Sequence, residues 1–336
     1  MAAVVAGVQH TGCGQPDFQT FLPLRCCALL YLPTSSDRTL NKSLVTHSDV
    51  IVYDLEDSVP PTRANKEGAR GRLSLFITDK LFGGLPQPER LAVRVNAVNT
   101  PFFQDDITQA LVPSCIRTLV IPKVHSIQEL DVVSTQIHAA NSRKTSPDPV
   151  NIVASIESAR ALYNVGEIAG WQSKFRPELG GKLTALLFAA EDYCADTKII
   201  RTKTRQELLY TRSQISITAR AFGLESIDMV CVDYKDSVYL KDECDDGRRL
   251  GFTGKQAIHP NQVEVIHSSF LPTTKEILRA ARILRQMEKA HGQQRGAAGL
   301  VTEDGGLEMI DQPMIKQAEY TIRTALAAGL EIPKIE

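Results

Sequence analysis

The sequence predicts an α/β protein whose parallel strands close into a (β/α)8 barrel (a TIM barrel), followed by a C-terminal helical extension. Short apolar runs recur eight times along the 336 residues, and helix-like stretches separate most of them. Most runs are continuously apolar, which is typical of parallel strands buried on both faces. Polar residues gather at the carboxyl ends of the runs, where such barrels form their active sites. These polar residues are Asp54, Glu56, Asp57, Arg94, Asn96, Lys123, Glu157, Glu191, Asp192, Asp233 and His259.

The expected strands follow one another at the spacing of β/α units. They cover residues 27–33, 49–57, 90–96, 118–124, 151–158, 183–192, 227–233 and 255–260. Helical patterns between and after them include residues 62–80, 126–140, 158–169, 203–222 and 261–268. This alternation favours a parallel sheet, and eight repeats favour closure into a barrel. A doubly wound open sheet is the alternative, but no GxGxxG motif opens the first helix.

The chain divides into three expected parts. Residues 1–24 are expected to be a flexible tail, residues 25–270 the catalytic barrel, and residues 271–336 a helical extension or lid. In the extension, helical patterns at 273–291 and 312–328 flank the glycine-rich link HGQQRGAAG, which predicts a hinge. The last helix would cover the active site or dock on another subunit.

Composition and charge narrow the class of protein. The formal net charge is −1, so we expect neither a nucleic-acid partner nor a membrane partner. The seven cysteines are scattered and include no CxxC pair, which predicts free thiols in a reducing compartment. The N-terminal tail lacks the positive residues of secretory and mitochondrial targeting segments. A mitochondrial matrix location and a cytoplasmic location both fit the free thiols.

Two acidic residues are the strongest candidates for chemistry. Glu157 and Asp192 each end an expected strand, so they would converge at the rim of the barrel. Two carboxylates in such a place repel each other unless a cation lies between them. Mg²⁺ suits these oxygen ligands, because it binds one or two carboxylates and completes its coordination with water and substrate. The alternative is that both acids pair with nearby arginines or cap helices.

Arg94 and the acidic run DLED lie at the ends of the third and second strands. The planar fork of Arg94 suits a carboxylate or enolate oxygen. A structural salt bridge to Asp54 or Glu56 is the alternative role for this arginine. The DLED acids, which include Asp57, would orient metal-bound water. They would otherwise hold nearby basic residues in place.

Three further residues allow both a structural and a chemical interpretation. Lys123 follows the fourth strand and would form a Schiff base in another type of aldolase, but two metal-type carboxylates would then have no purpose. His259 precedes a proline, which favours a turn over an acid/base role. Asp311 precedes a Gln-Pro pair and is expected to cap the last helix.

Five motifs carry a family resemblance. DLEDSVPP (followed by Lys66 and Arg70), VRVN, SIES, AAEDYCAD and GFTGKQAIHPNQ occur in this order. With them the chain resembles the citrate lyase beta-subunit-like and citramalyl-CoA lyase proteins of the HpcH/HpaI aldolase superfamily. The resemblance implies a Mg²⁺-dependent (β/α)8 barrel that acts on a coenzyme A thioester. It also implies a homotrimer or a hexamer of trimers.

The resemblance also assigns roles to individual residues. Glu157 and Asp192 look like the metal ligands, and Arg94 looks like the residue that holds the oxo-acid oxygen and steadies its charge. Glu56 and Asp57 look like the acids around metal-bound water.

Two further assignments concern the substrate. Asp311 resembles an acid/base residue that a neighbouring subunit delivers. Arg94 and Lys123 are the expected contacts to the thioester. The implied reaction cleaves, or forms, a 3-hydroxyacyl-CoA such as citramalyl-CoA or malyl-CoA, with acetyl-CoA and pyruvate or glyoxylate as the other partners. The alternatives are a subunit that needs an acyl-carrier partner, a metal aldolase that acts without coenzyme A, and a binding protein.

Two loops depart from the family pattern. Relatives usually read YxPGN after the first strand, whereas this chain has YLPTSSD at 31–37. Relatives often read IPKVE after the fourth strand, whereas this chain has IPKVH and thus His125. Both loops are expected on the active face, so the thioester tail or the acyl group is expected to differ.

Overall fold

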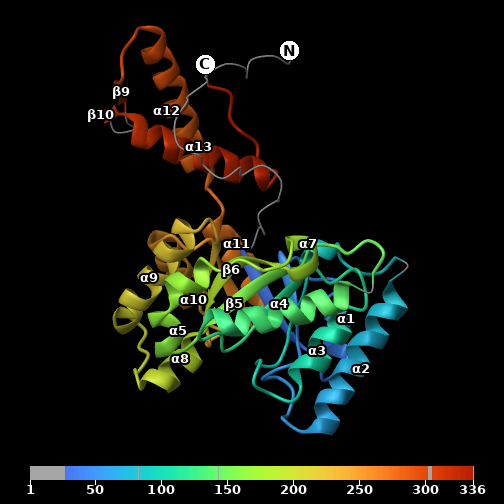
Figure 1. Ribbon diagram of the computed structural model, residues 1–336. Helices are drawn as coiled ribbons and strands as arrows, with labels where there is room; N and C mark the ends of the chain where they lie inside the picture. Colours follow the sequence, from blue (N-terminus) through green and yellow to red (C-terminus); the bar gives the residue numbers. More distant parts are fainter. Residues whose placement is uncertain (1–26, 82, 143, 302–304, 336) are drawn as a thin grey trace.

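The predicted barrel is confirmed by the computed structural model, which describes residues 27–81, 83–142, 144–301 and 305–335. Strands β1 to β8 pair in parallel in chain order, and β8 closes on β1 (Figure 1). The expected tail, residues 1–24, lies outside the described residues. The strands are β1 Ala28–Pro33, β2 Val50–Asp54, β3 Leu91–Arg94, β4 Thr118–Ile121, β5 Asn151–Ile156, β6 Lys182–Phe188, β7 Glu225–Asp228 and β8 Gly254–Ala257.

Helices surround this barrel (Figure 1). They are α1 Asp37–Lys42, α2 Arg63–Lys80, α3 Phe103–Ala110, α4 Ile127–Asn141, α5 Ala159–Tyr163, α6 Val165–Ala169, α7 Pro177–Gly180, α8 Ala190–Thr197, α9 Leu209–Ala221, α10 Ser237–Leu250 and α11 Val263–Phe270.

The strands are buried on both faces, as their continuous apolar sequences predict. Successive strand residues point to opposite faces, so Val50 and Val52 pack inside the barrel while Ile51 and Tyr53 pack outward against the helices. The outer layer forms the larger core and the barrel interior forms a smaller one. The polar strand ends therefore stand on a rigid, close-packed support.

Several elements differ from the sequence-based boundaries. The sixth expected strand ran to Asp192, but β6 ends at Phe188 and Asp192 lies in the first turn of α8. The segment AAEDYCAD contains no β-branched residue, and its alanines favour helix. The helix expected at 158–169 is two short helices, because Asn164 leaves the helical conformation and its side chain donates to the carbonyl of His125 at 2.8 Å.

The C-terminal extension consists of α12 Thr274–Gly292, a hairpin of β9 Ala298–Val301 and β10 Leu307–Ile310, and α13 Gln312–Ala327. It has its own small core, which includes Ile283, Met287, Ile310 and Ile315. Figure 1 shows it standing clear of the barrel beyond α11. The sequence did not predict the hairpin. Across the described ranges, no helix is both long and apolar enough to span a membrane.

Candidate active site

Arg94, the last residue of β3, lies against the acids at the end of β2 and just beyond it. Its Nε and Nη2 each donate to one carboxylate oxygen of Asp54 at 2.7 Å. Its Nη1 lies 3.0 Å from Glu56 Oε2 and 3.2 Å from Asp57 Oδ2. The salt bridge considered as the structural role of Arg94 is therefore present, and the third nitrogen is shared by two further acids.

Asp54 anchors this arrangement. Burial alone would raise its pKa, but the charge of Arg94 and its hydrogen bonds outweigh burial and lower the pKa. The Asp54 carboxylate also accepts the backbone N–H groups of Glu56 and Ser58 at 2.9 and 3.1 Å. An ionised Asp54 therefore fixes both the arginine and the acidic turn.

Lys66 holds the same acidic turn through its backbone carbonyl groups. Its Nζ donates to the carbonyl oxygens of Leu55 and Glu56, both at 2.8 Å, and the residue is buried. Arg70 pairs with Asp106 at 2.9 Å. In the described part of the chain, the DLED carboxylates thus form no ion pair with Lys66 or Arg70. They pair with Arg94 instead.

Glu157 follows β5 and is buried. Its Oε1 accepts the backbone N–H of Lys123 at 2.8 Å, and Lys123 adopts a left-handed backbone conformation with φ of 54°. Non-glycine residues in this conformation cluster at functional sites. Burial, followed by the charges of Asp192 and Glu56, raises the pKa of Glu157 to about 8.

Two further acids lie in the same electrostatic environment. Burial raises the pKa of Asp192, and the charge of Asp57 adds to this effect. Burial also raises the pKa of Glu56 to about 7, against the opposing charge of Arg94. The Lys123 side chain is 44% exposed, and its Nζ lies 3.8 Å from Glu56. The nearby cations therefore do not neutralise this acidic cluster.

The carboxylates fit a hard divalent cation. Within the described ranges, neither Glu157 nor Asp192 forms an ion pair, so arginine pairing does not explain them. Asp192 lies in the first turn of α8 but does not occupy its N-cap position, which belongs to Ala189. No group of three or more His, Cys, Asp and Glu side chains in the described part could hold a metal ion. A cation bound by two carboxylates would complete its coordination with water or substrate oxygens, which is usual for Mg²⁺.

Tyr31 belongs to the site, although no sequence signal singled it out. The guanidinium of Arg94 lies over the Tyr31 ring, 4.9 Å from its centroid. Burial raises the pKa of Tyr31 well above its ordinary value, so the phenol stays neutral. It points into the barrel from β1, and an aromatic residue in an apolar strand carries no polar signal.

The two histidines considered above lie on separate loops, His125 after β4 and His259 after β8. His259 caps a short helical turn, since its Nδ1 accepts the N–H of Asn261 at 3.2 Å, and its ring stacks on Tyr234. His125 Nδ1 lies 2.8 Å from the Ser158 hydroxyl, next to Glu157. The His125 departure therefore sits beside a proposed metal ligand.

Asp311 is the one predicted site residue that the structure does not bring to the others. It occupies the N-cap position of α13, but its exposed side chain makes no capping hydrogen bond. It follows β10 in the extension, which stands beyond the barrel (Figure 1). The capping role expected for it is therefore unfilled within this chain.

The structure is thus a (β/α)8-barrel protein with an arginine and several buried carboxylates clustered at the carboxyl ends of its strands. The sequence pattern of the HpcH/HpaI aldolase/citrate lyase family matches residues 28–260. The chain belongs to this family, as its motifs predicted, and is therefore an enzyme of the aldolase and lyase class.

Named relatives support the same assignment. The chain is 31% identical to the mitochondrial citramalyl-CoA lyase of Homo sapiens over 96% of its length and 92% of that protein. It is 30% identical to the citrate lyase subunit beta of Leuconostoc mesenteroides subsp. cremoris, over 90% and 94% of the two chains. A structure of CitE from Mycobacterium tuberculosis with magnesium, acetoacetate and coenzyme A is similar. Its TM-score is 0.67 at 26% identity, over 90% of this chain and 99% of that one.

Proposed function

We propose that this chain is a Mg²⁺-dependent carbon–carbon lyase that cleaves, or forms, a 3-hydroxyacyl-CoA such as citramalyl-CoA or malyl-CoA. The other partners are acetyl-CoA and a 2-oxo acid, either pyruvate or glyoxylate. The observation that carries the proposal is the pair of the buried Glu157 and the half-buried Asp192, whose pKa values are both raised and which lie near Arg94 and its acids. The relative named citramalyl-CoA lyase and the relative solved with magnesium and coenzyme A support it.

The strand-end residues divide the work of binding and charge stabilisation. Glu157 and Asp192 would hold Mg²⁺, which when bound supplies a Lewis acid for the oxygens of the acyl group. Arg94 would stabilise the charge on the oxygen that becomes the keto group. Asp54 holds Arg94 in place for this task. Glu56 and Asp57 would orient water beside the carboxylates.

The remaining step is a proton transfer at carbon. Cleavage would begin with transfer of the hydroxyl proton to the water that Glu56 and Asp57 orient, and would yield the 2-oxo acid and the enolate of acetyl-CoA. We assign protonation of that carbon to Asp311 from a second copy of the chain, because within one chain Asp311 lies in the extension with no capping bond. In the reverse direction the same carboxylate would remove the proton. Lys123, at the exposed rim, would contact the thioester.

Assembly and location follow from the same proposal. A site completed by a second copy requires a homo-oligomer, and we propose a homotrimer or a hexamer of trimers. The human, rat and mouse relatives are named as mitochondrial proteins, which supports a location in the mitochondrial matrix. The alternative is a subunit that depends on an acyl-carrier partner, and the relative named citrate lyase subunit beta favours it.

Release of 2-oxo acid from citramalyl-CoA and malyl-CoA tests the proposal. The product would be trapped with phenylhydrazine, in Mg²⁺ and in EDTA, for wild type, Glu157→Ala and the surface control Glu167→Ala. We expect EDTA-sensitive release of pyruvate or glyoxylate that Glu157→Ala loses and Glu167→Ala keeps. Folded wild-type protein that releases nothing from either thioester would contradict a stand-alone lyase. Release that appears only with an acyl-carrier protein would support the alternative.

A further inference from the structure

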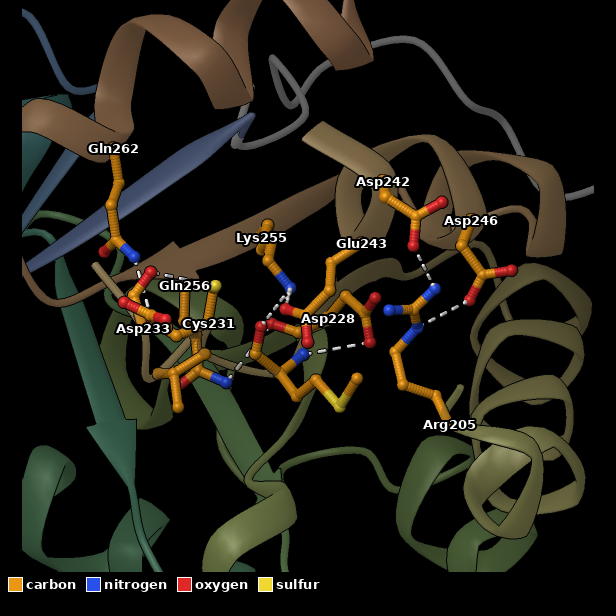
Figure 2. Close-up of polar contacts among 12 residues, drawn as sticks. Arg205, Asp228, Cys231, Asp233, Asp242, Glu243, Asp246, Lys255, Gln256 and Gln262 are labelled. Atoms are coloured by element: carbon orange, nitrogen blue, oxygen red, sulfur yellow. Dashed lines mark hydrogen bonds and ion pairs between the residues drawn. The ribbon is translucent and has the colours of Figure 1, made fainter. Parts of the chain in front are cut away.

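Four consecutive carbonyl groups, from the last residue of β7 onward, each accept a hydrogen bond from a side chain. The donors are Gln256 Nε2 to Asp228 O at 3.3 Å, Lys255 Nζ to Met229 O at 2.7 Å, Arg201 Nη2 to Val230 O at 3.0 Å, and Gln262 Nε2 to Cys231 O at 2.8 Å. We call residues 228–231 with these four donors the carbonyl bracket. Figure 2 shows Lys255, Gln256 and Gln262 converging on this segment.

The bracket has a clear physical cause. Strand β7 ends at Asp228, earlier than its apolar sequence predicts, so the next carbonyls have no ladder partner. A buried carbonyl without a donor is costly, and these side chains supply the donors. Two of the four donors, Lys255 and Arg201, carry a charge into the interior.

These two cations share one buried anion. Glu243 of α10 lies 3.0 Å from Lys255 Nζ and accepts from Arg201 Nη2 at 2.7 Å. The side chains of Glu243 and Lys255 are both 0% exposed. Two cations and one anion leave a positive charge, and a buried unbalanced charge is costly. Glu191 supplies the second anion, because Arg201 Nη1 lies 2.5 Å from its Oε1.

Glu191 lies next to Asp192 in the first turn of α8. The N-cap residue of α8 is Ala189, so no side chain caps this turn in the usual way. The Glu191–Arg201 pair instead links the turn to the end of β7, and Glu243 extends this link to α10. The Glu191 side chain, one residue before Asp192, thereby ties the first turn of α8 to the neighbouring β7–α10 unit of the barrel.

We propose that Arg201 is a positioning residue for Asp192, acting through Glu191 and fixed by the carbonyl bracket and Glu243. This inference rests on the proposed function, in which Asp192 binds Mg²⁺. Residues that orient metal ligands typically change metal affinity by about 10- to 100-fold when mutated. The proposal extends this effect to a residue that contacts neither the cation nor the ligand Asp192, but the residue next to that ligand.

The test measures Mg²⁺ binding by calorimetry, without substrate, and repeats it with Mn²⁺ by paramagnetic resonance. Arg201→Lys keeps the charge, but one ammonium group cannot hold Glu191, Glu243 and Val230 O together. We expect this variant to bind Mg²⁺ roughly 10-fold more weakly than wild type. The matched control is Arg205→Lys. The Arg205 side chain is also largely buried, 6% exposed against 11% for Arg201, and pairs with Asp242 and Asp246 of α10.

The variant Arg201→Met distinguishes a positioning role of Arg201 from a direct effect of its charge on Mg²⁺ binding. Removal of a positive charge near a cation site would by itself tighten cation binding, whereas loss of positioning weakens it. We expect weaker binding, and we expect Arg201→Met/Glu191→Gln to bind no more weakly than Arg201→Met alone. Unchanged or tighter binding in both Arg201 variants, or equal weakening in Arg205→Lys, would overturn the proposal. If the variant Asp192→Asn binds Mg²⁺ as tightly as wild type does, the proposed metal site itself is wrong.

Discussion

Arg94 and Asp54 form a pair whose structural and chemical roles can be separated by mutation. Arg94→Met leaves the buried Asp54 carboxylate without its partner, and breaking such a pair costs about 3–5 kcal/mol. We expect denaturant unfolding to show this loss, together with loss of oxo-acid release. The double variant Asp54→Asn/Arg94→Met removes the orphaned charge, so it should recover most of the stability. Recovery of activity in the double variant would contradict a role for Arg94 in catalysis.

At the residue scale, the sequence predicted which strand ends carry chemistry but not how their side chains pair. The period of the strands places Arg94 and Glu157 at the barrel rim, because backbone geometry fixes that position. Pairing depends on rotamers and on residues distant in sequence. Lys66 therefore bonds to backbone carbonyls rather than to acids, and Tyr31, an aromatic residue in an apolar strand, gave no polar signal.

At the scale of secondary structure, the contact between α10 and β8 depends on a buried carboxylate. Burial would raise the pKa of Glu243, but the charges of Lys255 and Arg201 outweigh it and lower the pKa below its ordinary 4.5. The ionised group therefore stabilises the fold above about pH 4.5, and this contribution is lost as pH falls through the lowered pKa.

The variant Glu243→Gln tests this pH dependence. At neutral pH it leaves the Lys255 ammonium buried without its counter-ion, so we expect a loss of about 3–5 kcal/mol. In urea unfolding between pH 7 and pH 3, wild type should lose stability more steeply than the variant below about pH 4.5. Parallel pH profiles would show that Glu243 is not ionised in the folded protein.

Secondary-structure elements were predictable where one pattern dominates. Helix α2 was expected at 62–80 and spans Arg63–Lys80, and Thr62 caps it as its sequence position favours. The β9–β10 hairpin was missed because its two strands have only four residues each, which is too short for a clear period, and β9 begins inside the glycine-rich link. Asp192 was placed on a strand because the apolar run LLFAA continues beyond Phe188 into a helix.

At the scale of the whole molecule, the barrel and the extension carry different parts of the proposed site. Glu157 and Arg94 belong to the barrel, and Asp311 belongs to the extension that stands beyond it (Figure 1). The sequence predicted both parts, but a single chain does not contain the arrangement that would join them. If a second copy supplies Asp311, each working site uses residues from two chains.

Mixed oligomers test this division directly. Asp311→Asn has an intact barrel, and Glu157→Ala has an intact extension, so each variant alone should be inactive. Co-expression should restore oxo-acid release at roughly a quarter of the wild-type rate, because a site works only where a barrel of the first variant meets an extension of the second. Mixing Asp311→Asn with the double variant Asp311→Asn/Glu157→Ala is the control and should restore nothing. An inactive co-expressed oligomer that contains both chains would show that Asp311 serves the barrel of its own chain or has no catalytic role.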